Sequence, residues 1–152
     1  MGLAKRNIEA PAFALLVGQT SCWKCSANTP VAALWIPAHN YWHEPDRDPD
    51  HEDDPSLLGF VEALSEPVLV HVRRHAPWMA FVAAKTAGFT YLANFCTSCS
   101  AVQGDHHLRE PGEVFFPETP AQLRELQLIP GDGTLEARAA PAVSRWMSDA
   151  ST

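Results

Sequence analysis

A chain of 152 residues that is 46% hydrophobic, with five Trp, seven Phe and two Tyr, can form one domain with a sizeable core but is too short for two independent cores. Its net charge of -7 is uneven, because seven acids and one base give residues 44–54 a charge of -6 and leave only -1 for all other residues. A cluster of Lys and Arg that could neutralise phosphates is missing, which argues against a nucleic-acid partner.

The N-terminal region resembles the start of a secretory signal only superficially. Lys5 and Arg6 precede a modest apolar run at residues 10–18, but Glu9 and Pro11 interrupt the pattern and the Gln-Thr-Ser-Cys that follows is a poor cleavage or lipidation site. No stretch reaches the roughly 18 apolar residues that a membrane helix requires. The sequence therefore predicts a cytoplasmic protein.

The first half of the chain predicts two strands, an acidic loop and a helix. Apolar runs at residues 13–17 and 31–36 predict strands on either side of a Cys-x-x-Cys pair. Residues 44–55 predict a solvated loop that ends where Asp54 can cap a helix with Pro55 at its first position. The residues at helical spacing behind this cap are Leu57, Leu58, Val61 and Leu64.

The second half predicts shorter elements. Residues 67–75 favour a helix, residues 89–93 a strand, residues 107–108 the start of a short strand, residues 119–126 a helix and residues 141–147 a C-terminal helix. Turns are expected at residues 103–105 and 110–112. The expected fold class is α+β, with a small antiparallel sheet, a zinc-ribbon-like four-cysteine site and a few short helices. We expect one zinc-stabilised domain over residues 1–152, with the acidic loop at about residues 44–55 inserted between the two cysteine pairs.

All four cysteines occur in two pairs of identical spacing, Cys22-Trp23-Lys24-Cys25 and Cys96-Thr97-Ser98-Cys99. We call each pair a knuckle. A tight turn of this spacing directs two thiolates at one ion, and two such turns complete a tetrahedral shell, so the pattern predicts one zinc ion held by Cys22, Cys25, Cys96 and Cys99. Redox pairs, disulfides and other metals are the alternatives.

The 70 residues between Cys25 and Cys96 make a long loop for a zinc site. Closing such a loop costs on the order of 4 kcal/mol, whereas structural zinc contributes roughly 10 to 16 kcal/mol in finger peptides. The ion can therefore join distant parts of the chain. Four protein thiolates leave no position for water or substrate, so the expected role of the zinc is structural.

The two knuckles and the residues around them resemble the split zinc-knuckle modules of uncharacterised bacterial proteins over residues 13–36 and 89–117. The residues that carry the resemblance are Cys22-Trp23-Lys24-Cys25, Thr29-Pro30-Val31, Tyr91, Asn94-Phe95-Cys96-Thr97-Ser98-Cys99, Gln103-Gly104-Asp105, Leu108, Glu110-Pro111-Gly112 and Phe115-Phe116-Pro117. The resemblance implies a zinc-ribbon-like core and a bacterial origin, and it implies no activity.

The seven histidines offer weaker candidates for a second metal site. His39 and His43, like His71 and His75, are four residues apart, but neither pair has the glutamate that a metalloprotease helix needs directly after its first histidine. His106 and His107 lie close enough to Cys99 in sequence to replace a thiolate ligand. The plain interpretation is that these histidines make ordinary hydrogen bonds, and the sequence leaves open whether any of them joins a metal site.

The acidic loop and the aromatic residues beside it are the candidate partner surface. Concentrated charge steers association, and aromatic residues are common in protein interfaces. The residues of this surface are Trp35, Tyr41, Trp42, Glu44, Asp46, Asp48, Asp50, Glu52, Asp53 and Asp54. With no nucleophile elbow, phosphate loop or dinucleotide fingerprint in the chain, we expect a protein-binding module rather than an enzyme. An immunity protein that neutralises a basic bacterial toxin domain would suit the size and local acidity.

The main alternative is a thiol-disulfide oxidoreductase that uses Cys22 and Cys25. The first cysteine of such a motif normally begins a helix, which lowers the pKa of its thiol. Here Pro30 and the apolar run at residues 31–36 predict a turn and a strand instead. The sequence therefore favours the metal site over the redox site.

Overall fold

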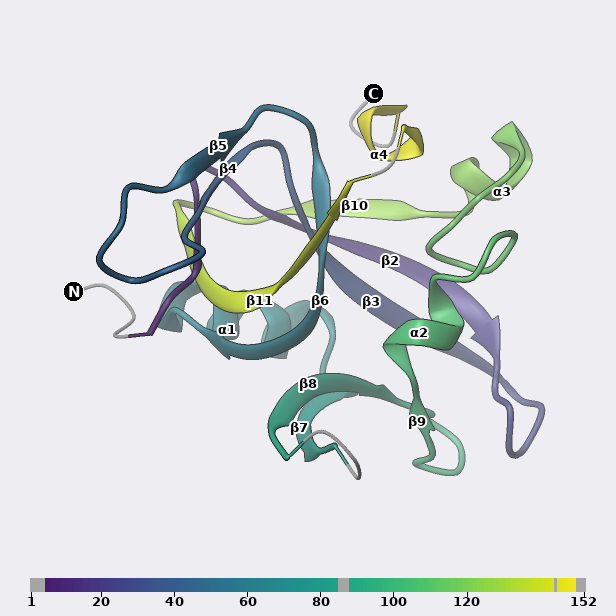
Figure 1. Ribbon diagram of the computed structural model, residues 1–152. Helices are drawn as coiled ribbons and strands as arrows, with labels where there is room; N and C mark the ends of the chain where they lie inside the picture. The colour runs from purple at the N-terminus through teal and green to yellow at the C-terminus, as the bar shows by residue number, and fades with distance from the viewer. Residues whose placement is uncertain (1–4, 85–87, 144, 150–152) are drawn as a thin grey trace.

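Two antiparallel sheets and four helices make up the part of the chain that the computed structural model describes, which is residues 5–84, 88–143 and 145–149. The larger sheet contains, in spatial order, β10 (Gln127–Pro130), β2 (Ala14–Ser21), β3 (Asn28–Ile36), β6 (Ser56–Leu64), β11 (Leu135–Val143), β1 (Ile8–Ala10), β4 (His39–Tyr41) and β5 (Asp50–Glu52). The smaller sheet contains β7 (Met79–Ala83), β8 (Thr90–Phe95) and β9 (Val102–Gln103). The helices are α1 (Glu66–His75), α2 (Asp105–Leu108), α3 (Pro120–Arg124) and α4 (Trp146–Asp149). Figure 1 shows the smaller sheet below the larger one, with β8 nearer to it.

Both faces of the larger sheet are covered, which explains why β2 and β3 are apolar without alternation. Leu15 and Leu34 belong to the apolar cluster on one face, and Leu16 and Trp35 belong to the cluster on the other. Strands that are buried on both faces lose the period-two pattern of hydrophobic and polar residues. Helix α1 packs on the first face. The segment after α2, together with α4, covers the second face.

Most predicted elements are present, with somewhat different bounds. The strands expected at residues 13–17, 31–36 and 89–93 are β2, β3 and β8, and the helices expected at residues 67–75 and 119–126 are α1 and α3. Thr119 caps α3, because its side chain accepts a hydrogen bond from the Gln122 N–H at 3.1 Å. The sheet-rich α+β architecture agrees with the expected class, although the main sheet is larger than predicted.

Four predicted elements were wrong, misplaced or incomplete. Residues 107–108 belong to helix α2 rather than to a strand, and residues 141–143 belong to β11, so that the C-terminal helix α4 begins only at Trp146. The acidic loop also contains the short strand β5. The largest error is the helix expected behind Asp54, because residues 56–64 form β6.

A bulge in β6 explains why its sequence imitates a helix. Arg138 of β11 pairs with Ala63 and Ala140 pairs with Gly59, so that residues 60–62 of β6 lie opposite Ala139 alone. At the bulge Phe60 adopts a φ of 47°, in the left-handed region that bulky residues rarely occupy. The extra residues break the two-residue alternation, and Leu58, Val61 and Leu64, which share one face of the sheet, then fall at the spacing of a helix face.

In the described ranges, no helix has the combination of length and apolar character needed to cross a membrane.

Candidate metal centre

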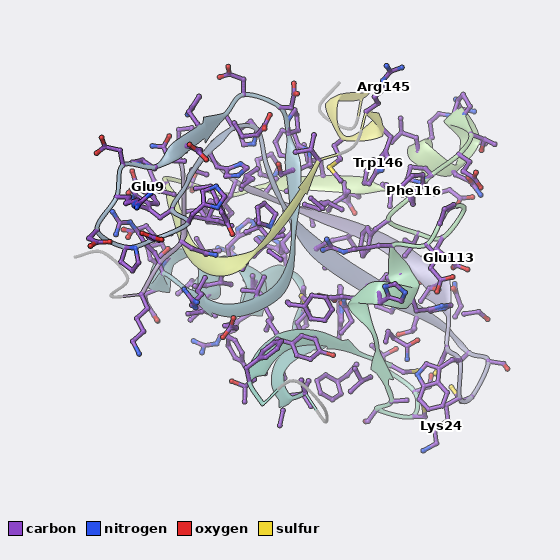
Figure 2. The ribbon with its side chains drawn as sticks, viewed as in Figure 1. Glu9, Lys24, Glu113, Phe116, Arg145 and Trp146 are labelled. Carbon is purple, nitrogen blue, oxygen red and sulfur yellow. The ribbon has the colours of Figure 1, made fainter. Side chains whose placement is uncertain are left out.

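Each knuckle forms the turn between two paired strands. Cys22–Cys25 joins β2 to β3, and Cys96–Cys99 joins β8 to β9. Figure 1 shows the end of the β2–β3 hairpin beside the β8–β9 turn, and in Figure 2 Lys24 projects from this end of the molecule, next to sulfur atoms. The two sheets therefore meet at the cysteines.

The two knuckles have the same backbone structure. In the first, the Cys22 N–H donates to the Ala27 carbonyl at 2.8 Å and the Ser26 N–H donates to the Cys22 carbonyl at 3.0 Å. In the second, the Cys96 N–H donates to the Ala101 carbonyl at 2.8 Å and the Ser100 N–H donates to the Cys96 carbonyl at 2.9 Å. The serines that follow the second cysteine of each pair have φ angles of 65° and 66°. One six-residue pattern, Cys-x-x-Cys-Ser-Ala, thus builds the same turn twice.

The four sulfur atoms form one compact group. All four Sγ atoms lie within 4.8 Å of one another, and this is the only cluster of metal-ligating side chains among the described residues. Between the knuckles, the Sγ atoms of Cys22 and Cys99 are 3.6 Å apart and those of Cys25 and Cys96 are 3.7 Å apart. No disulfide joins them. Sulfurs bound tetrahedrally to one ion at a metal–sulfur distance of ~2.3 Å would be about 3.8 Å apart, so the group has the dimensions of a four-thiolate metal site.

Backbone N–H groups favour the thiolate form of the first cysteine in each knuckle. Hydrogen bonds from the backbone of Cys25 and of Lys24 lower the pKa of Cys22 to about 6, although burial opposes the shift. The corresponding amides of Cys99 and Ser98 lower the pKa of Cys96. The N–H groups of Lys24 and Ser98 each lie 3.4 Å from the sulfur concerned. Each knuckle therefore stabilises one negative charge by itself.

Cys25 behaves in the opposite way. A hydrogen bond with the Ala27 backbone favours the Cys25 thiolate. Desolvation of the sulfur and the three neighbouring cysteines outweigh this effect and raise the pKa of Cys25 to about 11, although the residue as a whole is exposed. A cluster of thiols therefore resists the loss of further protons. A bound cation would remove this resistance, because its positive charge stabilises all four thiolates together.

Three side chains around the cysteines hold the two knuckles against each other. Gln103 is buried, and its Nε2 donates to the Cys22 sulfur at 3.4 Å and to the Ala101 carbonyl at 2.9 Å. Thr29 Oγ1 accepts from the Thr97 N–H at 3.1 Å. The Trp23 indole N–H donates to the Val102 carbonyl at 2.7 Å, while 65% of the residue is exposed. Each knuckle is thus bonded to residues of the other hairpin.

Asn94 connects the smaller sheet to the larger one. Its side chain is 1% exposed and pairs with both backbone groups of Ala32, accepting from the N–H at 2.8 Å and donating to the carbonyl at 3.0 Å. The β3–β6 ladder covers only residues 34–36 of β3, so the Asn94 amide takes the place of a neighbouring strand at Ala32. The Trp78 indole N–H also donates to Asn94 Oδ1, at 2.9 Å.

The segment after the second knuckle supports the bulge of β6. Asp105 accepts a hydrogen bond from the strained Phe60 N–H at 2.8 Å, and Arg109 donates to the Leu58 carbonyl. Gly59 leaves room for the Arg109 side chain, since a Cβ there would lie 3.0 Å from Nη1. Burial raises the pKa of Asp105 and lowers that of Arg109, and the opposite charge of each residue acts against the shift of the other.

The histidines do not join the cysteines. His106 and His107 are exposed, and the nearest acid to His107 Nδ1 is the Glu110 carboxylate at 3.8 Å. His71 and His75 of α1 contact each other with ring centroids 4.5 Å apart and planes inclined by 52°, and His71 Nε2 lies 3.1 Å from the Ile129 carbonyl. His43 lies beside Asp50 at 2.8 Å. Ordinary hydrogen bonds and ring contacts thus account for these residues.

The predicted partner surface needs one correction. Trp35 is 7% exposed and its indole donates to the Met147 carbonyl at 3.1 Å, so it belongs to the core and is not accessible to a partner. Tyr41 and Trp42 are half-buried, and the Arg6 guanidinium lies 4.3 Å above the Trp42 ring. Six of the seven acids are exposed and Glu52 is half-buried. The Glu44, Asp50 and Asp53 carboxylates lie beside Arg47, His43 and His51, respectively.

Sequence reasoning missed the roles of Thr29, Gln103 and Asn94. The repeated pattern contains a clue to Thr29 and Gln103, because each residue follows the first cysteine of its knuckle by seven positions. Both are fully buried polar residues. Asn94 has no comparable clue, since its partner Ala32 is 62 residues away in the chain.

Comparisons with family models, with curated proteins and with solved structures find no match to this chain. The interpretation of the site therefore depends on its geometry and chemistry.

Proposed function

We propose that Cys22, Cys25, Cys96 and Cys99 bind one Zn²⁺ in a zinc-ribbon-like structural site, and that the stabilised protein acts as a protein-binding module. The observation that carries this proposal is the cluster of four free thiols from two equivalent turns, with distances of 3.6 and 3.7 Å between the knuckles. Four soft thiolates in a tetrahedral shell suit zinc and leave no position for a substrate. The ion's role is therefore to hold the β2–β3 hairpin against the β8–β9 turn.

The metal content of protein purified without added metal tests this assignment. We expect one equivalent of zinc and four thiols that react only after denaturation or chelation. Cys96→Ser should lose the zinc and lower the melting temperature by about 10 °C or more, because the metal links residues distant in sequence. Ser98→Ala is the matched control, since only its backbone N–H contacts the sulfur and that group is retained. The proposal would be refuted if wild type contained no metal and had reactive thiols, and if Cys96→Ser had the same melting temperature as wild type.

The thiol-disulfide oxidoreductase remains the second candidate because the pKa of Cys22, about 6, suits a reactive thiolate. Two features speak against it. Cys22 is buried while Cys25 is exposed, and Cys25 leads into a left-handed turn and β3 rather than into a helix. Turnover of an insulin-type disulfide by the metal-free protein, lost in Cys22→Ser, would favour this candidate over the binding module.

The partner we propose is a protein with a basic surface, and an immunity protein for a bacterial toxin is the narrowest form of this proposal. Its support is the exposed acidic loop, in which Asp46 and Asp48 have no ion-pair partner among the described residues. Affinity capture should compare wild type with Asp46→Asn, Asp48→Asn and Asp54→Asn combined. A control with Glu110→Gln, Glu125→Gln and Asp132→Asn changes the net charge equally at other exposed positions. Equal capture by both variants would refute the role of the loop.

A further inference from the structure

The smaller sheet has an edge strand that lacks the features with which proteins usually protect such edges. Among the described residues, the sheets end at β10, β5, β7 and β9. Strand β10 ends in Pro130, β5 carries two acids, and β9 has only two residues. Strand β7 reads Met-Ala-Phe-Val-Ala, with no charge, proline or glycine in five residues. Proline, charge and short length are the common protections of exposed edges, and β7 has none of them.

The outward backbone of β7 is free to pair. The Phe95 N–H donates to the Trp78 carbonyl, and the Ala84 N–H donates to the Phe89 carbonyl. The backbone N–H and carbonyl groups of the even-numbered residues in this segment therefore point toward β8. Because facing directions alternate along an antiparallel ladder, the backbone groups of Met79, Phe81 and Ala83 point away from β8. Of these groups the Met79 N–H bonds to the Ala76 carbonyl at 3.0 Å. The N–H groups of Phe81 and Ala83 make no hydrogen bond within the described residues.

The side chains on β7 are also available. Phe81 is 43% exposed, and Ala80 and Ala83 are exposed as well. The main contacts of β7 are with β8, whereas β8 also lies beside β6 and β3. Strand β7 is therefore the outer member of its sheet, and its free edge is both apolar and unprotected.

We propose that β7 pairs with β7 of a second copy of this chain, antiparallel and with Phe81 opposite Phe81, so that the two smaller sheets form one continuous sheet. In this register the two Phe81 residues exchange N–H to carbonyl bonds. The Ala83 N–H of each copy donates to the Met79 carbonyl of the other. Within the described residues these backbone groups have no other hydrogen-bond partner, and for Phe81 this holds for both the N–H and the carbonyl.

A second copy fits this edge because the pairing of a strand with itself is two-fold symmetric, and such pairing brings together only apolar side chains here. A charged edge such as that of β5 would place like charges near each other in the same arrangement. The pairing of two five-residue strands buries less surface than the roughly 1,000 Å² that a stable interface buries. The dimer should accordingly be weak, with a population that rises with protein concentration.

Sedimentation equilibrium of the purified metal-bound protein over a series of concentrations tests the proposal. Wild type should change from monomer to dimer along the series. Phe81→Lys places two like charges opposite each other and should raise the dimer dissociation constant by about tenfold or more. Val70→Lys is the control, because Val70 is an exposed apolar residue on α1, away from the edge. This variant should associate as wild type does.

A second variant and a second measurement keep the test independent of the folding of Phe81→Lys. Ala83→Pro removes an N–H that does not face β8, and should weaken the dimer while leaving the β7–β8 ladder in place. Hydrogen exchange should show protection of the Phe81 and Ala83 amides that increases with concentration, with the Ala80 and Val82 amides protected throughout. A wild type that is monomeric across the series, association unchanged in Phe81→Lys, or exchange at residues 81 and 83 independent of concentration would each overturn the proposal.

Discussion

Two asparagine side chains substitute for missing strands. Asn94 bonds to both backbone groups of Ala32, and Asn7 bonds in the same way to Ala139, donating to its carbonyl and accepting from its N–H, each at 2.9 Å. The primary amide suits this role because it carries a donor and an acceptor side by side, like a peptide group. Each site lies where the ladder of a sheet is interrupted, at the end of the β3–β6 pairing or opposite the β6 bulge. Neither residue could be recognised from sequence, because both partners are distant in the chain.

Replacing Asn94 by alanine should destabilise the fold strongly. The change leaves the N–H and carbonyl of Ala32 and the Trp78 indole N–H without their partner in the interior. Unpaired buried groups cost about 1 to 3 kcal/mol each, so we expect the free energy of unfolding to fall by about 3 to 5 kcal/mol in urea titrations. Asn28→Ala, at an exposed position at the start of β3, is the control and should change it by less than about 0.5 kcal/mol. Similar losses in the two variants would contradict the assigned role.

At the scale of elements, sequence patterns located β2, β3, β8, α1 and α3 because each signal is local: an apolar run, an aromatic and β-branched run, or a proline behind a cap. The same reasoning placed a helix on β6, since the three-residue bulge at residues 60–62 shifts the buried positions to helical spacing. The stabilisation of this bulge comes from Asp105 and Arg109, 45 and 51 residues from the groups that they bond. A one-dimensional pattern does not contain such a contact. The cysteine cluster could be predicted because its four residues are recognisable in the sequence by their type and by their repeated spacing.

The packing of β2 against the segment after α2 depends on the missing side chain of Gly18. A Cβ there would lie 2.4 Å from Val114 Cγ2 and 2.9 Å from Leu126 Cδ2. Gly18→Ala should therefore separate these elements and lower the free energy of unfolding by about 1 to 3 kcal/mol, as overpacking does. Gly104→Ala is the control, because a Cβ there meets no atom within 4 Å and its φ is -66°. If Gly18→Ala and Gly104→Ala changed the stability in thermal unfolding equally, the contact of Gly18 with Val114 and Leu126 would not be tight.

At the scale of the whole molecule, stability should decrease as the solution becomes acidic. His39 is 3% exposed and its Nδ1 has no hydrogen-bond partner among the described residues. Burial lowers its pKa from 6.5; the nearby Glu52 acts against this shift, and His51 adds to it. Because the folded state disfavours the proton, the contribution of His39 is complete above pH 6.5 and is lost as the pH falls through the lowered pKa.

His39→Asn isolates this contribution, because the two proteins differ only at the buried histidine. As the pH falls below 6.5, the urea midpoint of wild type should fall more steeply than that of the variant. Parallel curves would show that His39 does not couple folding to protonation.

The separation of the two knuckles along the chain also has a consequence for synthesis. Cys96 follows Cys25 by 71 residues, which at 5 to 20 residues per second corresponds to roughly 4 to 14 s of translation. During that interval the first knuckle leaves the ribosome as an exposed dithiol with half a coordination shell. A nascent chain has then to keep Cys22 and Cys25 reduced until the second hairpin is made. The proposed zinc site therefore predicts that maturation of this protein depends on the thiol redox state and the zinc supply of the cell.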